Sequence, residues 1–184
     1  LLFDDAVNLV KDNIPVLLKA DMISQVSKGL NEIIKYGITE VHDRTVGKEG
    51  IEIFRSLIDS NRFPMRLYVI LSGEDSVLVE NYLNKGPEIN YKDKLTIRSI
   101  SIDYDGLFEV QDSFMNDEYI SDPKRKVPYV TTSDIARIYS KAIDKNFQFC
   151  IKAVGDRAVD SSLNVLKKVI KQKIALKIGR LMLG

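Results

Sequence analysis

The chain has 184 residues, of which 45% are hydrophobic, and it carries 27 basic and 26 acidic side chains. This is the composition of a single globular domain or of a large part of a bigger one. The balanced charge excludes nucleic-acid binding through an overall positive field, and the lack of an apolar run of roughly 18 residues excludes a membrane span. A single Cys and no signal peptide before residue 20 predict a reducing, cytoplasmic location, and a single His excludes a zinc site built mainly from imidazoles.

Hydrophobic periodicity and turn residues divide the chain into alternating helices and strands. In chain order, we expect helices over 3–15 and 21–36, a strand over 38–42, a helix over 47–61, a strand over 65–71, a helix over 77–83 capped by Asp75, a strand over 95–104, a helix over 132–146 capped by Thr132 or Ser133, a strand over 147–154 and a helix from Gly155 onward. The apolar positions of the third strand change phase near Ser99, which predicts a bulge. Residues 107–130 form a long polar loop, which in a compact domain is functional or disordered.

The strand–helix alternation, repeated four times, predicts parallel strands joined by helical crossovers. The near-continuous apolar runs at 67–71 and 147–151 are typical of strands buried on both faces. Two architectures satisfy this pattern, a doubly wound sheet and a (β/α) barrel. A complete eight-fold barrel needs about 250 residues, so four units make half of one.

Ligand sites in either architecture lie beyond the carboxyl ends of the strands. The polar residues there include Asp103, and those for which a role can be weighed are His42, Asp43, Asp105, Lys152 and Asp156. Four of them also fit structural roles: Asp43 and Asp156 as helix caps, His42 as a hydrogen-bonded wall residue and Asp105 as a turn residue. Lys152 lies in an apolar strand, so we expect it to point outward, to pair with Asp105 or Asp156, or to titrate low.

Five segments, spread in order over most of the chain, carry a combined pattern. They are FDDAV at 3–7, GITEVHD at 37–43, ISIDYDG at 100–106, YISDP at 119–123 and FQFCIKAVGDRA at 147–158. Together they resemble the metal-dependent hydrolases of the amidohydrolase superfamily, in the subgroup that includes N-substituted formamide deformylase.

The resemblance implies one domain over 1–184, a partial (β/α)8 TIM barrel that holds the second to fifth β/α units of a longer protein. It also implies hydrolysis of amide or formamide bonds other than peptide bonds, in which a divalent metal, usually zinc, lowers the pKa of a bound water. The family's His-x-His pair would lie upstream of Leu1, and two further ligand positions fall on Ser101 and Lys152. Because an ammonium cannot replace an imidazole ligand, we expect no metal or other cofactor in this chain and no activity from it as given.

On this interpretation Asp105 and Asp156 are the catalytic candidates at the strand ends, and His42 and Asp43 are candidates for binding a small amide-type substrate. No nucleic-acid or membrane partner is expected. Two alternatives stay open. One is a non-catalytic binding or assembly module whose open sheet edges pair with a second copy. The other is different chemistry, in which a desolvated Lys152 acts as nucleophile or base.

Overall fold

The computed structural model describes residues 10, 13–15, 17–120 and 127–182, with side chains described as far as residue 175 in the last helix. Most of the helix expected over 3–15 and the 121–126 part of the long loop lie outside the described residues. Within the described part, no helix has both the length and the apolar character that crossing a membrane requires.

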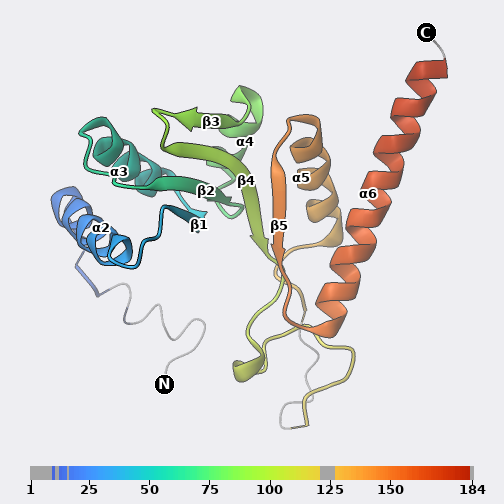
Figure 1. Ribbon diagram of the computed structural model, residues 1–184. Coiled ribbons are helices and arrows are strands. Elements are labelled where there is room, and N and C mark those ends of the chain that lie inside the picture. Colours follow the sequence, from blue (N-terminus) through green and yellow to red (C-terminus); the bar gives the residue numbers. More distant parts are fainter. Residues whose placement is uncertain (1–9, 11–12, 16, 121–126, 183–184) are drawn as a thin grey trace.

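Four β/α units follow one another along the chain, as the sequence predicts (Figure 1). The elements are α2 (Lys19–Ile34), β1 (Glu40–Val46), α3 (Lys48–Asp59), β2 (Arg66–Ser72), α4 (Ser76–Lys85), β3 (Glu88–Tyr91), β4 (Leu95–Asp103), the 3-10 helix η1 (Phe108–Val110), α5 (Thr132–Asp144), β5 (Gln148–Lys152) and α6 (Asp156–Met182). The α/β architecture with a parallel sheet is that of a partial TIM barrel.

The parallel part of the sheet has β2 between β1 and β4, with β5 on the other side of β4. The bulge predicted near Ser99 is confirmed, because the register between β2 and β4 shifts between Val69 and Ile70. The sequence reading missed β3, a four-residue strand that pairs antiparallel with the first half of β4 while β5 pairs with the second half. The strand has four residues and Asn90 has a left-handed backbone (φ 58°), so its alternation of apolar and polar residues is too short to predict a strand.

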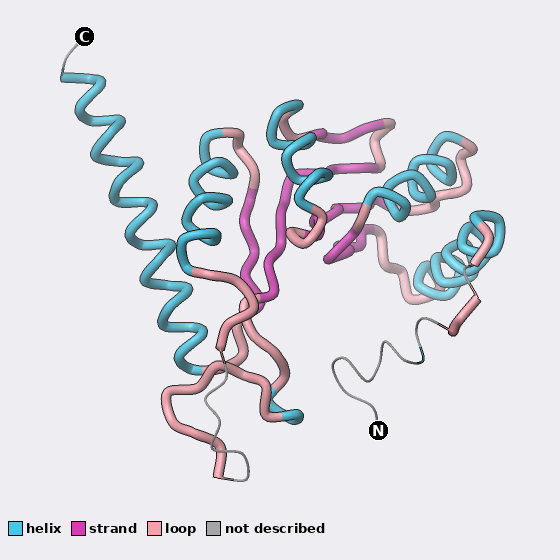
Figure 2. The backbone as a smooth tube through the Cα atoms, turned by 180° about the vertical axis from the view of Figure 1, so that it is seen from behind, coloured by secondary structure: helices cyan, strands magenta, loops and turns pink. Residues whose placement is uncertain are grey.

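Side chains alternate along each strand, and this gives the sheet one apolar and one polar face. The apolar face packs against the helices, which lie around one side of the sheet, with α4 in front of the strands in Figure 2. Its fully buried residues are Val69, Leu71, Leu95, Ile97 and Ile100. The polar face consists of Glu40, His42, Arg44, Tyr68, Ile70, Ser72, Ser99, Ser101, Asp103, Gln148, Cys150 and Lys152. The expectation that strands are buried on both faces holds in β4, where Ser99 and Ser101 of this second face are buried, but is wrong for β1 and β5, where His42, Arg44 and Gln148 are exposed.

Two helix starts test the capping predictions. Asp75 caps α4 as expected, since its carboxylate accepts a hydrogen bond from the backbone N–H of Leu78 at 2.9 Å. The cap of α5 is Thr131, whose hydroxyl accepts from the N–H of Asp134 at 3.1 Å, so the expected caps Thr132 and Ser133 are one and two residues too late. Strand β1 also continues four residues past the predicted end, because its pairing with β2 extends to Val46.

Candidate functional site

The carboxyl ends of the parallel strands lie at one edge of the sheet, where α/β folds carry their ligand sites (Figure 1). Three charged side chains of the polar face meet there. Arg44 Nη1 of β1 lies 2.6 Å from Asp103 Oδ1 at the end of β4, and Lys152 Nζ at the end of β5 lies 3.7 Å from Asp103 Oδ2. We call Arg44, Asp103 and Lys152 the ion cluster. Its two cations face one carboxylate, so the cluster carries net positive charge.

Lys152 is not the buried lysine that its apolar strand suggests. Its side chain is 31% exposed, and its partner is Asp103 rather than the expected Asp105 or Asp156. The reason is register: Asp103 and Lys152 are paired residues on neighbouring strands and project to the same face. Solvent contact and one ion pair together remove most of the cost of burying an unpaired ammonium.

Asp105, a predicted catalytic residue, is completely buried and holds three chain segments together. One carboxylate oxygen accepts the backbone N–H groups of Phe114 and Gly155, at 2.9 and 2.8 Å, and the other accepts that of Val154 at 2.8 Å. The carboxylate thus joins the end of β4 to the long loop and to the end of β5. Three charge-assisted bonds make this a positioning group, and the catalytic role stays a prediction.

Asp156, the other predicted catalytic residue, begins α6 and also binds the long loop. Its carboxylate accepts from the backbone N–H and the side-chain amide of Asn116, at 2.9 and 3.1 Å, and from the N–H of Arg157 at 2.7 Å. Gly155 makes this contact possible, because a Cβ there would collide with the backbone carbonyl of Phe114. Asp156 is exposed, so a substrate can reach it, but its present contacts order the loop.

His42 and Asp43, predicted to bind substrate together, project to opposite faces of β1. The His42 ring stacks on Tyr68 of β2 on the polar face, with centroids 4.7 Å apart, and its Nε2 lies 3.6 Å from Glu40. The Tyr68 hydroxyl in turn donates to the Gln148 side chain of β5 at 2.5 Å, and burial raises the pKa of Tyr68. This network crosses the polar face from β1 to β5.

Asp43 faces the helices instead, in the register position beside Val69. It lies in an apolar pocket between α2, β1 and α3, and burial raises the pKa of its carboxyl above the ordinary value, opposed only by a backbone hydrogen bond from Arg44. Its alternative role as a helix cap is wrong, because β1 continues to Val46 and Gly47 precedes α3. The substrate-binding roles of His42 and Asp43 stay predictions.

A catalytic divalent metal, as the resemblance implies, does not fit the residues at the strand ends. Ser101 is buried and its hydroxyl donates to the carbonyl of Leu71 at 3.3 Å. Lys152 offers an ammonium, and the nearby carboxylate of Asp103 is already bonded to two cations. Among the residues that the structure describes, no three His, Cys, Asp or Glu side chains are grouped so that they could hold a metal ion.

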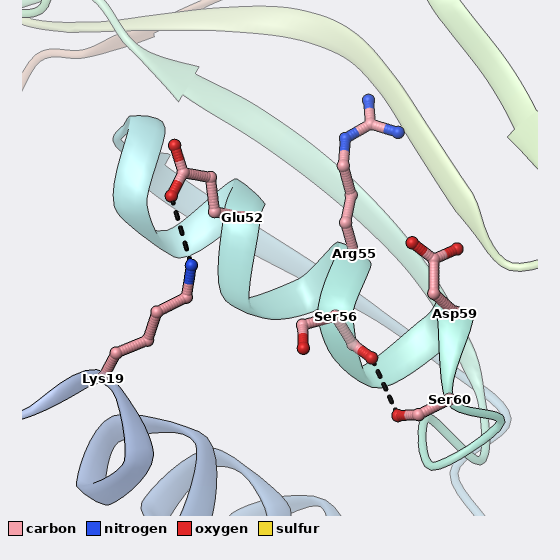
Figure 3. Close-up of a pocket in the computed structure, with 6 residues that line it drawn as sticks. All are labelled: Lys19, Glu52, Arg55, Ser56, Asp59 and Ser60. Atoms are coloured by element: carbon pink, nitrogen blue, oxygen red, sulfur yellow. Dashed lines mark hydrogen bonds and ion pairs between the residues drawn. The ribbon is translucent and has the colours of Figure 1, made fainter.

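A hollow of about 640 Å³ lies away from these residues, on the outer side of α3 (Figure 3). Lys19 of α2 closes one side of it through an ion pair with Glu52 at 3.4 Å, and the Ser60 hydroxyl donates to the Ser56 carbonyl at 2.7 Å. The first contact joins α2 to α3 and the second lies within the end of α3, and no predicted site residue lines the hollow.

Sequence reasoning missed Arg44, Tyr68 and Gln148 as members of the polar face, and it placed Asp103 at a strand end without giving it a role. The available signal was parity within each strand: Arg44 is two residues from His42, and Asp103 is two residues from Ser101. Only the strand order, which places β2 between β1 and β4, could have shown that Arg44 reaches across to Asp103.

Comparison with known proteins supplies a family and a fold. The model of the Amidohydrolase family matches residues 1–180. Two crystal structures share the fold, an uncharacterized metal-dependent hydrolase from Pyrococcus horikoshii OT3 (TM-score 0.77) and another from Pyrococcus furiosus (TM-score 0.78). Each is 18% identical to this chain and covers 90% of it, while the chain covers 34% and 36% of their respective lengths. The chain therefore spans about a third of these structures. No curated protein matches it.

Proposed function

This chain belongs to the amidohydrolase family, and from that premise we propose that its chemistry descends from metal-assisted hydrolysis of carbon–nitrogen bonds other than peptide bonds, acting on small amide-type molecules. We further propose that the chain as given does not carry out this hydrolysis. The formamide deformylase-like subgroup is part of the same proposal, supported by the segments at 37–43 and 147–158.

The observation that carries the proposal is the ion cluster at the strand ends. Lys152 stands at a position where the resemblance implies an imidazole, and it is engaged with Asp103 in place of any metal-directed role. A protonated amine has no lone pair to donate to a metal, and its charge repels a divalent cation. Arg44 adds a second positive charge to the same carboxylate. This arrangement favours an anion over a metal ion.

The chain's own residues then have roles in shaping the strand ends. Asp105 and Asp156 order the long loop, and the polar face presents His42, Tyr68 and the ion cluster to any small molecule at this edge. Acid–base roles for Asp105 and Asp156 and a substrate contact from His42 remain proposals. A cytoplasmic location, expected from the single Cys, also remains one.

The test measures metal content and hydrolysis together. Purified chain is incubated with zinc, desalted, and analysed for bound zinc by elemental analysis, and the same sample is assayed on simple amides and N-formyl amino acids. We expect substoichiometric zinc and no zinc-dependent hydrolysis. A metal-loaded amidohydrolase run in parallel verifies that the assay detects activity. One zinc per chain with turnover of these substrates would refute the proposal.

A second candidate function, a non-catalytic assembly module, is favoured by the outer parallel strands β1 and β5. Among the described residues, β1 pairs only with β2 and β5 only with β4, so each leaves one edge with unpaired backbone groups. Pairing with a second copy would satisfy these groups. Light scattering over a range of concentrations tests this: we expect a dimer, and a monomer that persists at high concentration would contradict it.

A further inference from the structure

The pocket around Asp43 lies on the helical side of the sheet, apart from the ion cluster and the polar face. It has a volume of about 360 Å³ and lies between α2, β1, α3 and the start of β2. Ligand sites of small molecules fall in the range of about 300–1,000 Å³ and are mostly apolar with a few polar groups. The pocket fits this description in size and in character.

Its walls are apolar and include an aromatic corner. Leu30 of α2, Val41 of β1 and the rings of Phe54 and Phe63 line it, and the two rings meet edge to face with centroids 6.0 Å apart. Gly29 of α2 also borders it, and a Cβ there would meet nothing within 4 Å. A glycine inside a helix lowers stability relative to alanine, and here it leaves space beside the pocket.

Asp43 is the acidic group on this apolar wall. In the described part of the chain, its carboxyl interacts with the adjacent backbone N–H of Arg44 and with no side-chain donor or cation. A carboxylate partly removed from water and without a cationic partner is unfavourable, and a bound cation that also fills apolar space would correct this. The aromatic corner and the carboxylate together therefore favour a ligand that has both a positive charge and an apolar body.

We propose that this pocket binds a small primary amine with an aromatic or branched apolar body, its ammonium on Asp43 and its apolar body against Phe54 and Phe63. The proposal is independent of hydrolysis at the strand ends, because the pocket opens on the other face of β1. His42 also borders the pocket, but its ring stacks on Tyr68 on the polar face, so Asp43 supplies the carboxylate for the ammonium.

Calorimetric titration of the chain with benzylamine, and with benzyl alcohol as a neutral molecule of the same shape, tests the proposal. We expect benzylamine to bind about tenfold or more tightly than benzyl alcohol, the ratio that one charge-assisted hydrogen bond supplies. In Asp43→Asn this preference should fall to near one while benzyl alcohol binding is unchanged. Asp160→Asn, which removes an exposed carboxylate of α6, is the matched control and should behave as the parent chain.

A second variant tests the location. Gly29→Leu fills the space beside the pocket, so it should abolish binding of both compounds while the thermal midpoint is equal to or above that of the parent. The proposal is overturned if benzylamine does not bind the parent chain at millimolar concentration, if Asp43→Asn binds it equally well, or if folded Gly29→Leu retains binding.

Discussion

The buried carboxylate of Asp105 supports the sharpest prediction about stability. Its two oxygens accept three backbone N–H groups, and none of its surface is exposed. In Asp105→Asn one oxygen is replaced by an NH₂ group, which is a donor. If the remaining amide oxygen keeps the bonds to Phe114 and Gly155, the N–H of Val154 faces another donor and is left unsatisfied.

The magnitude follows from these contacts. An unsatisfied buried donor costs about 1–3 kcal/mol, and a hydrogen bond to a charged group contributes about 1.5–3 kcal/mol against roughly 1 for a neutral one. We therefore expect Asp105→Asn to lower the free energy of unfolding by about 2–4 kcal/mol, and Asp105→Ala by more, since all three N–H groups lose their acceptor. With a urea slope of roughly 2 kcal/mol per molar, the Asn variant shifts the midpoint by about 1–2 M.

Urea unfolding followed by circular dichroism gives the stability, and amide hydrogen exchange locates the loss. Exchange should accelerate at Val154 and at Phe114, which lie at the strand end and in the long loop. Asp156→Asn is the control: its side chain is exposed, so we expect a loss below about 1 kcal/mol. A midpoint for Asp105→Asn equal to that of the parent, with unchanged exchange at Val154, would refute the reasoning.

Three further predictions use the same unfolding assay. Thr131→Ala removes the cap of α5 and should cost about 1 kcal/mol, whereas Thr131→Ser should be near neutral; equal losses would contradict the cap. Burial raises the pKa of the Glu88 carboxyl, but hydrogen bonds from Arg55 and Lys85 outweigh burial and hold this pKa below its ordinary value. The stability that Glu88 contributes is therefore present above the unfolded pKa and lost as pH falls. Arg55→Met should cost about 1–3 kcal/mol at pH 7 and less at pH 3, and a loss independent of pH would count against this. Because burial raises the pKa of Asp43, the folded chain loses stability as pH rises from the unfolded pKa to the folded one. Asp43→Asn should therefore raise the urea midpoint relative to the parent at pH 7 but not at pH 3. An equal difference in midpoint at the two pH values would contradict this prediction.

The order of elements could be predicted because each long element has its own local signal. The apolar run before Ser72 and the cap at Asp75 both identify their elements from a few neighbouring residues. Strand β3 has no such signal, and it exists because the first half of β4 offers it a partner. Strand β1 likewise ends where its pairing with β2 ends, so its last residues, which read as polar, belong to the strand.

The site was predicted less completely because its contacts join residues distant in sequence. Asp103 and Arg44 are 59 residues apart, and their contact depends on strand order and register. The adjacent residues His42 and Asp43 fit one motif, yet alternation along β1 sends them to different faces. A motif therefore located the strand ends correctly, while the direction of each side chain followed from the sheet.

Asp103 and Asp105 are carboxylates two residues apart whose different environments give them different roles. Asp105 is buried from solvent, and its carboxylate oxygens accept hydrogen bonds from backbone N–H groups in fixed positions. Proton transfer to Asp105 would therefore disrupt the hydrogen bonds that connect β4, the loop and β5. Asp103 keeps 26% of its side chain exposed and has two partly exposed cations as partners. A partly exposed ion pair adds little net stability, so exchange of a partner at Asp103 costs the fold little. Charge-dependent binding at the strand ends is therefore to be sought around Asp103 and Lys152, with Asp105 holding the backbone that positions them.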